Sequence, residues 1–418
     1  MDDSAHTRML RLFRDIPDHR MQGKVFHKLH DILVIAVCAI LAGLEQYTQM
    51  EDYAKANFDW FNSFLDLDNG IPSHDTFGNV FASLSPDAFE KAIQEWIYAL
   101  RGSTTAGKHV AIDGKALRGS FNKTAEKSAV YMVNAYVHEN HTVFAQLKVD
   151  DKSNEITAIP DLLEMLELKD STVTIDAMGC QREIAQKIID KQGHYVLALK
   201  GNQSSLLDDV QLFMDDLIAN SPEKDYGYYE SIEKNHGRIE IRKCWTVDKI
   251  DWLIPRHNWP GLKSLSAVEC KRIVGEKEST ERRYFISSHF DQPAQEMAGF
   301  IRNHWRIENE RHWSLDVSFN EDSCRSRTKN AAENLARIRR IALMMLKNEK
   351  TCKLGVKSKR AKAGYDRDYL LTVLRLGQGT LNLLIAIKGI ISPFLFVAVC
   401  LLTLSWKFNL NSNPVDPS

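Results

Sequence analysis

The stretch from Ser171 to Lys200, "STVTIDAMGCQREIAQKIIDKQGHYVLALK", decides the fold that this sequence predicts. Its two ends, "STVTIDA" and "HYVLALK", are short runs of β-branched and apolar residues, which favour strands. Between them, "QREIAQKIIDKQG" repeats apolar residues at helical spacing and closes on a glycine, which predicts an amphipathic helix. A strand, a helix and a second strand in so short a span indicate one unit of an α/β sheet.

The residues before this unit enlarge the predicted sheet. Three β-rich runs separated by turn signals come first, and a helical run then leads into Ser171; they are "KHVAIDGK" (108–115), "AVYMVNAYVHE" (129–139), "HTVFAQLKVD" (141–150) and the helical "ITAIPDLLEMLEL" (156–168). The order is therefore β-β-β-α-β-α-β. Such an order predicts a mixed sheet with helices on its faces.

The segments around this α/β core predict a different organisation. The N-terminal part reads as helical, with Ser73 and Ser85 as N-caps of two short amphipathic helices. After Lys200, "HGRIEIRKCWTV", "SLSAVECKRIV" and "ERRYFISS" predict strands, and "GEKEST" predicts a hairpin loop. We expect five segments: a helical domain at 1–105, a first core part at 106–200, a β-rich insertion at 201–297, a helix completing the core at 298–350, and a basic and apolar C-terminal stretch at 351–418.

Two aspartates follow similar apolar runs in this core. Asp113 follows "VAI" and Asp176 follows "VTI", and a glycine comes within three residues of each. Ligands of open α/β sheets gather beyond strand ends, where a divalent cation can neutralise a desolvated carboxylate. The alternative is that each aspartate caps a turn or a following helix. The predicted strand order allows the two strands to be neighbours.

A third acid stands out in "HWRIENERHWSLDVSFNED" (304–322). Helical spacing places one carboxylate on an otherwise apolar stripe, which consists of Ile301, Trp305, Glu308, His312 and Leu315. The acids Glu310, Asp316, Glu321 and Asp322 fall on another face or near the predicted helix end and receive no role. Glu308 either makes a hydrogen bond that holds the helix or binds a metal, and three carboxylates without a His/Cys cluster favour Mg²⁺ or Mn²⁺ over zinc.

Composition excludes several classes of protein. The chain is 44% hydrophobic and 26% charged, as in globular proteins, and its net charge of −1 gives no global field for nucleic acid. Seven scattered cysteines without metal-ligand spacing predict a reduced, cytoplasmic protein. The apolar run Ile32–Leu44 is too short to span a membrane and predicts a buried helix. Gly389–Trp406 has spanning length but contains Pro393, so a membrane anchor is the less favoured interpretation.

Several long motifs, in the same order, resemble the H-repeat-associated proteins, a group of bacterial insertion-sequence transposases of the DDE type. The resemblance covers residues 10 to 370 and is carried by "AIDGKALRGS", "DDKSNEITAIPDLLEML", "TIDAMGCQREIA", "YVLALKGNQ" and "NHWRIENERHWSLDVSFNEDSCRSR". It departs at the C-terminus. The group ends near "KRAKAGYDRDYLLTVL", whereas this chain continues through an apolar tail at 381–406, as a frameshift, a fusion or read-through would produce.

The resemblance implies an RNase H-like catalytic core that is split by the β-rich insertion. It assigns Asp113, Asp176 and Glu308 as catalytic ligands of two Mg²⁺ or Mn²⁺ ions, which would support nicking of transposon ends and joining of the 3′-hydroxyl to target DNA. It further implies element ends and target as DNA partners, a homodimer or higher oligomer on DNA with no obligatory protein partner, and a nucleoid-associated location in the bacterial cytoplasm.

Local basic residues could supply the DNA contacts that the neutral net charge does not. The candidates near the three acids or on the strand "HGRIEIRK" are Lys115, Arg118, Lys200, His236, Arg238, Arg242, Arg325 and Arg327. For each one, a solvated surface charge is the alternative. The helices from Ser73 to Leu100 either bind transposon ends or only pack. Two other functions remain open: a metal-dependent nuclease without strand transfer, and an inactive DNA-binding relic.

Overall fold

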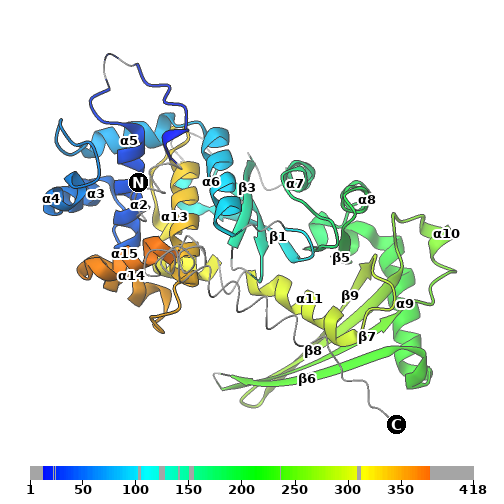
Figure 1. The fold of residues 1–418 in the computed structure, drawn as a ribbon. Helices are drawn as coiled ribbons and strands as arrows, with labels where there is room; N and C mark the ends of the chain where they lie inside the picture. The colour runs from blue at the N-terminus through cyan, green and yellow to red at the C-terminus, as the bar shows by residue number, and fades with distance from the viewer. Residues whose placement is uncertain are drawn as a thin grey trace, which may run out of the picture.

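The structure, a computed structural model, describes most of the chain between residues 13 and 376. The described residues are 13–21, 23, 25–101, 105–121, 128–139, 142–149, 155–235, 237–307 and 312–376. Within them, a helical part lies beside one end of a long sheet (Figure 1).

A nine-stranded mixed sheet runs through the molecule in the order β3-β2-β1-β4-β5-β9-β8-β7-β6. Its first five strands along the chain are β1 (His109–Leu117), β2 (Val130–Val137), β3 (Thr142–Val149), β4 (Thr172–Ile175) and β5 (His194–Ala198). Helix α7 (Glu155–Glu164) precedes β4 and α8 (Arg182–Asp190) follows it. The predicted β-β-β-α-β-α-β order is therefore confirmed. Strand β1 pairs antiparallel with β2 and parallel with β4, so the sheet is mixed as predicted.

The predicted insertion extends this sheet. Its strands are β6 (Gly227–Asn235), β7 (Arg238–Val247), β8 (Ser264–Val274) and β9 (Lys277–Ser287). Because β9 pairs antiparallel with β5, the insertion and the core share one continuous hydrogen-bonded ladder. The predicted hairpin at "GEKEST" is confirmed, but its loop is shorter than predicted. Only Gly275 and Glu276 separate β8 from β9, and Gly275 has a positive φ of 60°, which suits a two-residue turn.

The insertion also contains two helices, α9 (Ser204–Asn220) and α10 (Ile254–His257), which the sequence analysis did not predict. The signal for α9 is present in the sequence, because its buried residues Leu206, Val210, Met214 and Leu217 recur at helical spacing. Strand β6 was missed as well. It forms the last strand of the sheet, and Ile232 on it is 59% exposed, so its pattern lacks a buried face.

Helix α11 (Ala294–Ile307) covers the face of the sheet opposite to α7 and α8 (Figure 1). Near its start, Met297 and Ile301 pack against Phe285 of β9. At its end, Ile307 packs against Ala111 of β1. The helix therefore reaches from the insertion to the strand that carries Asp113.

The helical part combines both ends of the described chain. Its members are α2 (Leu29–Leu41), α3 (Tyr47–Ala56), α4 (Phe58–Asn62), α5 (His74–Ser83), α6 (Pro86–Arg101), α12 (Trp313–Phe319), α13 (Ala331–Asn348), α14 (Val356–Tyr365) and α15 (Arg367–Leu376). Ser73 caps α5 as predicted, since its Oγ accepts a hydrogen bond from the Thr76 N–H. Helix α2 is buried along almost its whole length and packs against α13, which confirms the predicted buried helix.

The predicted basic stretch after residue 350 is largely helical, and two of its cations are buried. The Arg360 guanidinium donates to the Ile40 carbonyl oxygen at 2.7 Å and pairs with Glu45. Lys359 donates to the Leu346 carbonyl oxygen at 3.0 Å. These contacts join α14 to α2 and α13. No helix within 13–376 that the structure describes has the length and apolar character needed to cross a membrane. The apolar tail at 381–406 lies outside the described residues.

Candidate active site

Asp113 and Asp176 lie next to each other on adjacent parallel strands. The pairing of β1 with β4 ends at Ile112 and Ile175, so the two aspartates follow at the same level of the sheet. Side chains alternate along a strand, so Asp113 and Ala111 share one face of β1. Ala111 on this face contacts Ile307 of α11. The structure thus brings together the two acids that the sequence singled out.

Asp113 follows the apolar run "VAI" but does not end its strand. Strand β1 continues to Leu117, because its last residues keep β2 as a partner after β4 has ended. Asp113 therefore lies where β1 loses one of its two neighbours. Its Oδ1 accepts a hydrogen bond from the Gly114 N–H at 2.8 Å. The missing neighbour leaves room for the side chain beyond the end of β4.

Asp176 fills the capping role that the sequence left open. Its Oδ1 accepts hydrogen bonds from the N–H groups of Met178 and Gly179, at 3.1 and 3.3 Å, and so caps the short 3₁₀ helix Ala177–Gly179. Its other oxygen, Oδ2, accepts no hydrogen bond from the described residues. The capping hydrogen bonds engage Oδ1 and thereby fix the direction of Oδ2.

Gly114 is required between Asp113 and the following lysine. A Cβ at this position would lie 2.3 Å from Cε1 of Tyr131 and 2.8 Å from a carboxylate oxygen of Glu155. These contacts are on the face opposite to Asp113, so the glycine lets α7 and β2 approach β1 closely. A side chain at position 114 would clash with these two residues, which explains the glycine between Asp113 and Lys115.

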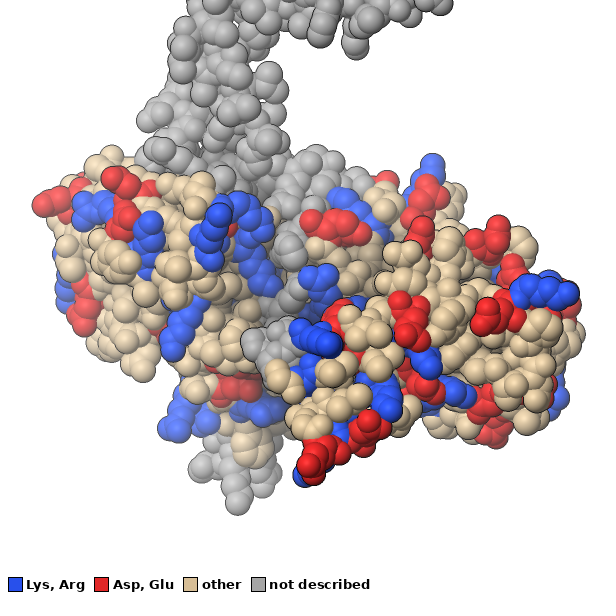
Figure 2. All heavy atoms as spheres, turned by 90° about the horizontal axis from the view of Figure 1, so that it is seen from below, with Lys and Arg blue, Asp and Glu red and all other residues tan. Residues whose placement is uncertain are grey.

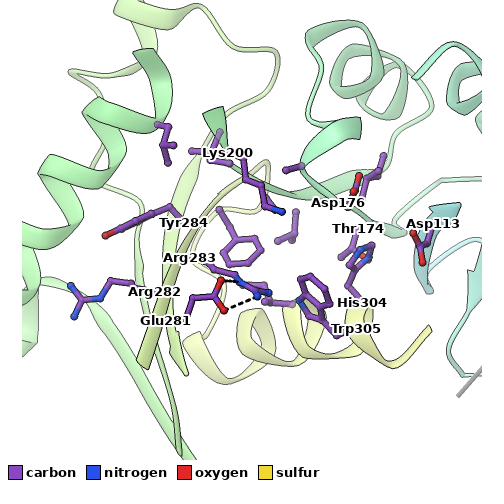
Figure 3. Close-up of a pocket in the computed structure, with 18 of the residues that line it drawn as sticks. Asp113, Thr174, Asp176, Lys200, Glu281, Arg282, Arg283, Tyr284, His304 and Trp305 are labelled. Atoms are coloured by element: carbon purple, nitrogen blue, oxygen red, sulfur yellow. Dashed lines mark hydrogen bonds and ion pairs between the residues drawn. The ribbon is translucent and has the colours of Figure 1, made fainter. Parts of the chain in front are cut away.

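A cavity of about 620 Å³ opens beside the two aspartates. Figure 3 shows Asp113, Asp176, Thr174 and His304 together at one end of it. Lys200 follows the end of β5, is exposed and lines the same cavity. The lining of the cavity thus includes the two aspartates and, after the end of β5, the cation Lys200.

Glu308, the third acid of the prediction, lies outside the described residues. The described part of α11 ends at Ile307. On the other side of the gap, Nδ1 of His312 is 3.6 Å from Oδ2 of Asp113. Two other members of the predicted stripe have inward positions, because Ile301 is buried and Trp305 lines the cavity.

Lys115 is engaged with acids that the sequence left without a role. Its Nζ donates to Asp316 at 2.5 Å and to Glu321 at 2.7 Å, and its side chain is 9% exposed. Burial disfavours the ammonium, but the two carboxylates outweigh this effect and raise the pKa of Lys115. The sequence predicts a phosphate contact for Lys115. Its buried ion pairs favour a structural role that joins β1 to the segment after α11.

The remaining predicted DNA contacts near the acids differ in exposure. The Arg118 side chain is 81% exposed and lies 3.5 Å from Asp322. Arg325 is exposed, whereas Nε of Arg327 donates to the Gly119 carbonyl oxygen at 3.0 Å. Arg118 and Arg325 are thus accessible to a ligand, and Arg327 also holds the backbone beside β1.

A second cavity, of about 530 Å³, lies beside the first, between α11 and strands β6 to β9. We call it the basic groove. Its cationic lining residues include Arg238, Arg242, Arg283, Arg302 and Arg306. Arg283 and Trp305 line both cavities, so the two adjoin.

Carboxylates partly neutralise the basic groove. Arg238 lies 2.9 Å from Glu240, and Arg302 lies 2.5 Å from Glu233. The structure therefore places Arg238 and Arg242 on one face, as predicted, and adds Arg302 from α11. His236 lies outside the described residues. Figure 2 shows Lys and Arg side chains gathered along the middle of the lower face of the molecule.

Comparison with known proteins identifies the family. Residues 104–345 match the family described as transposase DDE domain, and residues 10–97 match the family described as DDE_Tnp_1-associated. The chain belongs to the transposase DDE domain family. The resemblance that the sequence motifs predicted is thereby confirmed.

Two relatives extend this DDE transposase assignment over most of the chain. The chain is 42% identical over 364 residues to "H repeat-associated putative transposase YhhI" of Escherichia coli (strain K12), covering 86% of this chain and 95% of that protein. It is 43% identical over 366 residues to "Putative transposase YncI" of Escherichia coli O157:H7, covering 86% and 92%. The family model names a transposase domain, and both relatives are named as putative transposases.

Proposed function

We propose that the chain cuts the ends of an insertion sequence and joins them to target DNA by metal-dependent phosphoryl transfer. One observation carries the proposal: Asp113 and Asp176 lie at the same level of two adjacent parallel strands and flank one cavity. The sheet order β3-β2-β1-β4-β5 and the family assignment together support an RNase H-like core for this site.

The donor set fits a hard divalent cation. Both side chains offer carboxylate oxygens, which Mg²⁺ and Mn²⁺ prefer, and Oδ2 of Asp176 accepts no hydrogen bond from the described residues. Among the residues that the structure describes, no three His, Cys, Asp or Glu side chains form a group that could hold a metal. The two aspartates therefore need a further ligand from elsewhere in the chain, and we propose Glu308.

Two bound ions would activate the attacking oxygen and stabilise the leaving oxygen of each transfer. The protein itself contributes orientation. The backbone N–H groups after Asp176 fix the direction of its carboxylate. Lys200 supplies a positive charge at the cavity for a DNA phosphate. Arg118 and Arg325 add exposed cations after β1 and after α12.

The basic groove supplies a path for DNA away from the aspartates. It adjoins the first cavity and is lined by cations from α11 and from the inserted strands. Phosphate contacts position DNA without reading its sequence. We therefore assign Arg238, Arg242 and Arg302 to binding of the DNA backbone. The oligomeric form on DNA is expected to be a dimer or larger, because two element ends must be brought together.

The decisive experiment uses the full chain and duplex DNA carrying the inverted repeats that flank its gene. We expect Mg²⁺-dependent nicking at the repeat ends, and joining of pre-nicked ends to a target plasmid. Asp113→Asn, Asp176→Asn and Glu308→Gln should each abolish both steps while the melting temperature stays near that of the wild type. Glu310→Gln is the matched control, because helical spacing places it on another face.

The outcomes separate the alternatives. Nicking without joining of pre-nicked ends would identify a metal-dependent nuclease. Binding of end DNA without nicking by the full chain would identify an inactive relic. Wild-type nicking by Glu308→Gln would show that the third ligand is another acid.

A further inference from the structure

A buried hydroxyl joins three elements of the candidate active site. Oγ1 of Thr174 lies 2.9 Å from Nε2 of His109 and 3.1 Å from Nδ1 of His304. Thr174 is in β4 two residues before Asp176, His109 begins β1, and His304 is in the last turn of α11. All three side chains are buried, with exposures of 2%, 4% and 9%. Figure 3 shows Thr174 and His304 side by side next to the two aspartates.

The chemistry of these groups makes the bridge directional. A hydroxyl has one proton and two lone pairs, so it can donate to only one of the two imidazole nitrogens and must accept from the other. Burial lowers the pKa of His304 to about 4, and burial together with His138 and His304 lowers the pKa of His109 well below its usual value. Both rings are therefore neutral at pH 7 and can serve as one donor and one acceptor.

We propose that Thr174 is a positioning residue whose hydroxyl fixes the end of α11 relative to the strands that carry Asp113 and Asp176. The inference rests on the proposed function, because Glu308 comes directly after the described end of α11 and is the third proposed ligand. Elsewhere α11 is held to β6 of the insertion by the ion pair between Arg302 and Glu233, and its end packs on β1 through the apolar contact of Ile307. Apolar packing is non-directional, whereas a hydrogen bond fixes distance and angle.

The sequence contains a matched control on the same strand. Oγ1 of Thr172 lies 3.0 Å from Nε2 of His289, and Thr172 is 5% exposed. This second bond is a part-buried threonine–histidine contact on the same face of β4. His289, however, belongs to the segment after β9 and meets α11 by stacking on Phe300. Replacing Thr172 therefore removes a similar bond without removing the hydrogen bond to α11.

The experiment compares Thr174→Val, Thr174→Ser and Thr172→Val in the full chain. Valine keeps the shape of threonine and removes the hydroxyl, while serine keeps the hydroxyl. Binding of Mn²⁺ alone is measured from the electron paramagnetic resonance signal of free Mn²⁺, and nicking is measured as a function of Mg²⁺ concentration. Residues that orient metal ligands typically change metal affinity by about 10- to 100-fold. We expect Thr174→Val to weaken Mn²⁺ binding about tenfold.

The other two variants should stay near the wild type in Mn²⁺ affinity. Thr174→Ser keeps the hydroxyl and therefore the bridge between the two histidines. Thr172→Val should lower thermal stability, as Thr174→Val does, but should leave Mn²⁺ affinity unchanged. Hydrogen–deuterium exchange in metal-free protein gives an independent readout. We expect the amides at the end of α11 to exchange faster in Thr174→Val than in Thr172→Val, because only the first variant releases that end.

Equal exchange of α11 in the two valine variants would overturn the inference, as would unchanged Mn²⁺ affinity in Thr174→Val when the wild type binds Mn²⁺. If the wild type neither binds Mn²⁺ nor nicks DNA, the proposed function fails. In that case selective release of α11 by Thr174→Val would still support the bridge as the anchor of the helix. A similar shift of Mn²⁺ affinity in Thr172→Val would show a general loss of stability and overturn the positioning role.

Discussion

Lys115 shows how a single residue acquires its role from distant parts of the chain. In the sequence it is a cation two positions after Asp113, which suits a phosphate contact. In the structure it meets Asp316 and Glu321, which are more than 200 positions away. No local pattern reveals such a pairing, because the spacing of residues within one strand carries no information about the segment that packs over it. The same limit applies to Thr174, His109 and His304.

Lys115→Met should destabilise the protein strongly. The change leaves Asp316 and the buried Glu321 without their cation, and breaking a buried ion pair in this way typically costs about 3–5 kcal/mol. Because the folded-state pKa of Lys115 is raised, its contribution is complete below the usual lysine pKa of 10.5 and is lost as the pH rises through the higher folded value. Urea unfolding at pH 7 measures the loss.

Lys55→Met provides the comparison for this prediction. Lys55 also contacts a carboxylate, Glu51, at 2.6 Å, but its side chain is 58% exposed. Solvent screens this surface pair, so its removal should leave the unfolding free energy nearly unchanged. A loss of stability in Lys115→Met no greater than in Lys55→Met would contradict the structural role and return Lys115 to the list of DNA contacts.

At the scale of elements, α11 and the inserted strands together form the basic groove. Arg242 comes from β7 and Arg302 from α11, and both contact Glu233 of β6. The groove therefore exists only when helix and insertion are assembled against each other. Its cations are held in place by carboxylates, which fix their geometry but reduce the net positive charge.

The double variant Arg242→Gln, Arg302→Gln should bind end DNA more weakly. The plot of log affinity against log salt has a negative slope, and each lost phosphate contact reduces its magnitude by about 0.9. The magnitude should therefore decrease by about 2 in the double variant. The unpaired Glu233 would add repulsion. Fluorescence anisotropy over a range of salt concentrations measures the slope. Lys271→Gln is the control, because Lys271 lies on the same sheet, pairs with Glu278 and does not line the groove. An unchanged slope in the double variant would place the DNA elsewhere.

The helices and strands that could be predicted from the sequence are mostly those whose apolar residues recur at helical or strand spacing. The strands with buried apolar runs and the helix between β4 and β5 were predicted, and so was the proximity of Asp113 and Asp176. Strand β6 was missed because an edge strand with exposed Ile232 lacks the alternation of a half-buried strand. The joining of β9 to β5 was also missed, since pairing between distant strands leaves no local signal. Helix α9 was missed although its spacing was readable.

On the scale of the whole molecule, α14 and α15 complete the helical part. Arg360 reaches the end of α2, and the Tyr369 hydroxyl donates to Glu349 at 2.8 Å. The sequence described this region only as basic, since charge alone does not reveal which cations are buried. The described fold therefore extends to Leu376.

A chain ending at Leu376 should keep the melting temperature and the nicking activity of the full chain, because every contact of the described fold is retained. A chain ending at Glu349 should melt at a much lower temperature, because it lacks Lys359, Arg360 and Tyr369. Differential scanning calorimetry and the nicking assay compare the two. Stability of the shorter chain equal to that of the longer one would contradict the role of α14 and α15. Higher activity in the Leu376 chain than in the full chain would support the relic interpretation, in which the tail suppresses function.

The contact between Arg360 and Ile40 spans 320 positions in the chain and has a consequence for biosynthesis. Helix α2 is apolar on nearly every side, and it leaves the ribosome long before α13 and α14 exist to cover it. We expect the nascent chain to depend on chaperones during this interval, and a late premature stop codon to leave α2 uncovered permanently. Proteolysis or aggregation would then remove the shortened product, so that decayed copies of such an element would not accumulate as competitors for its DNA ends.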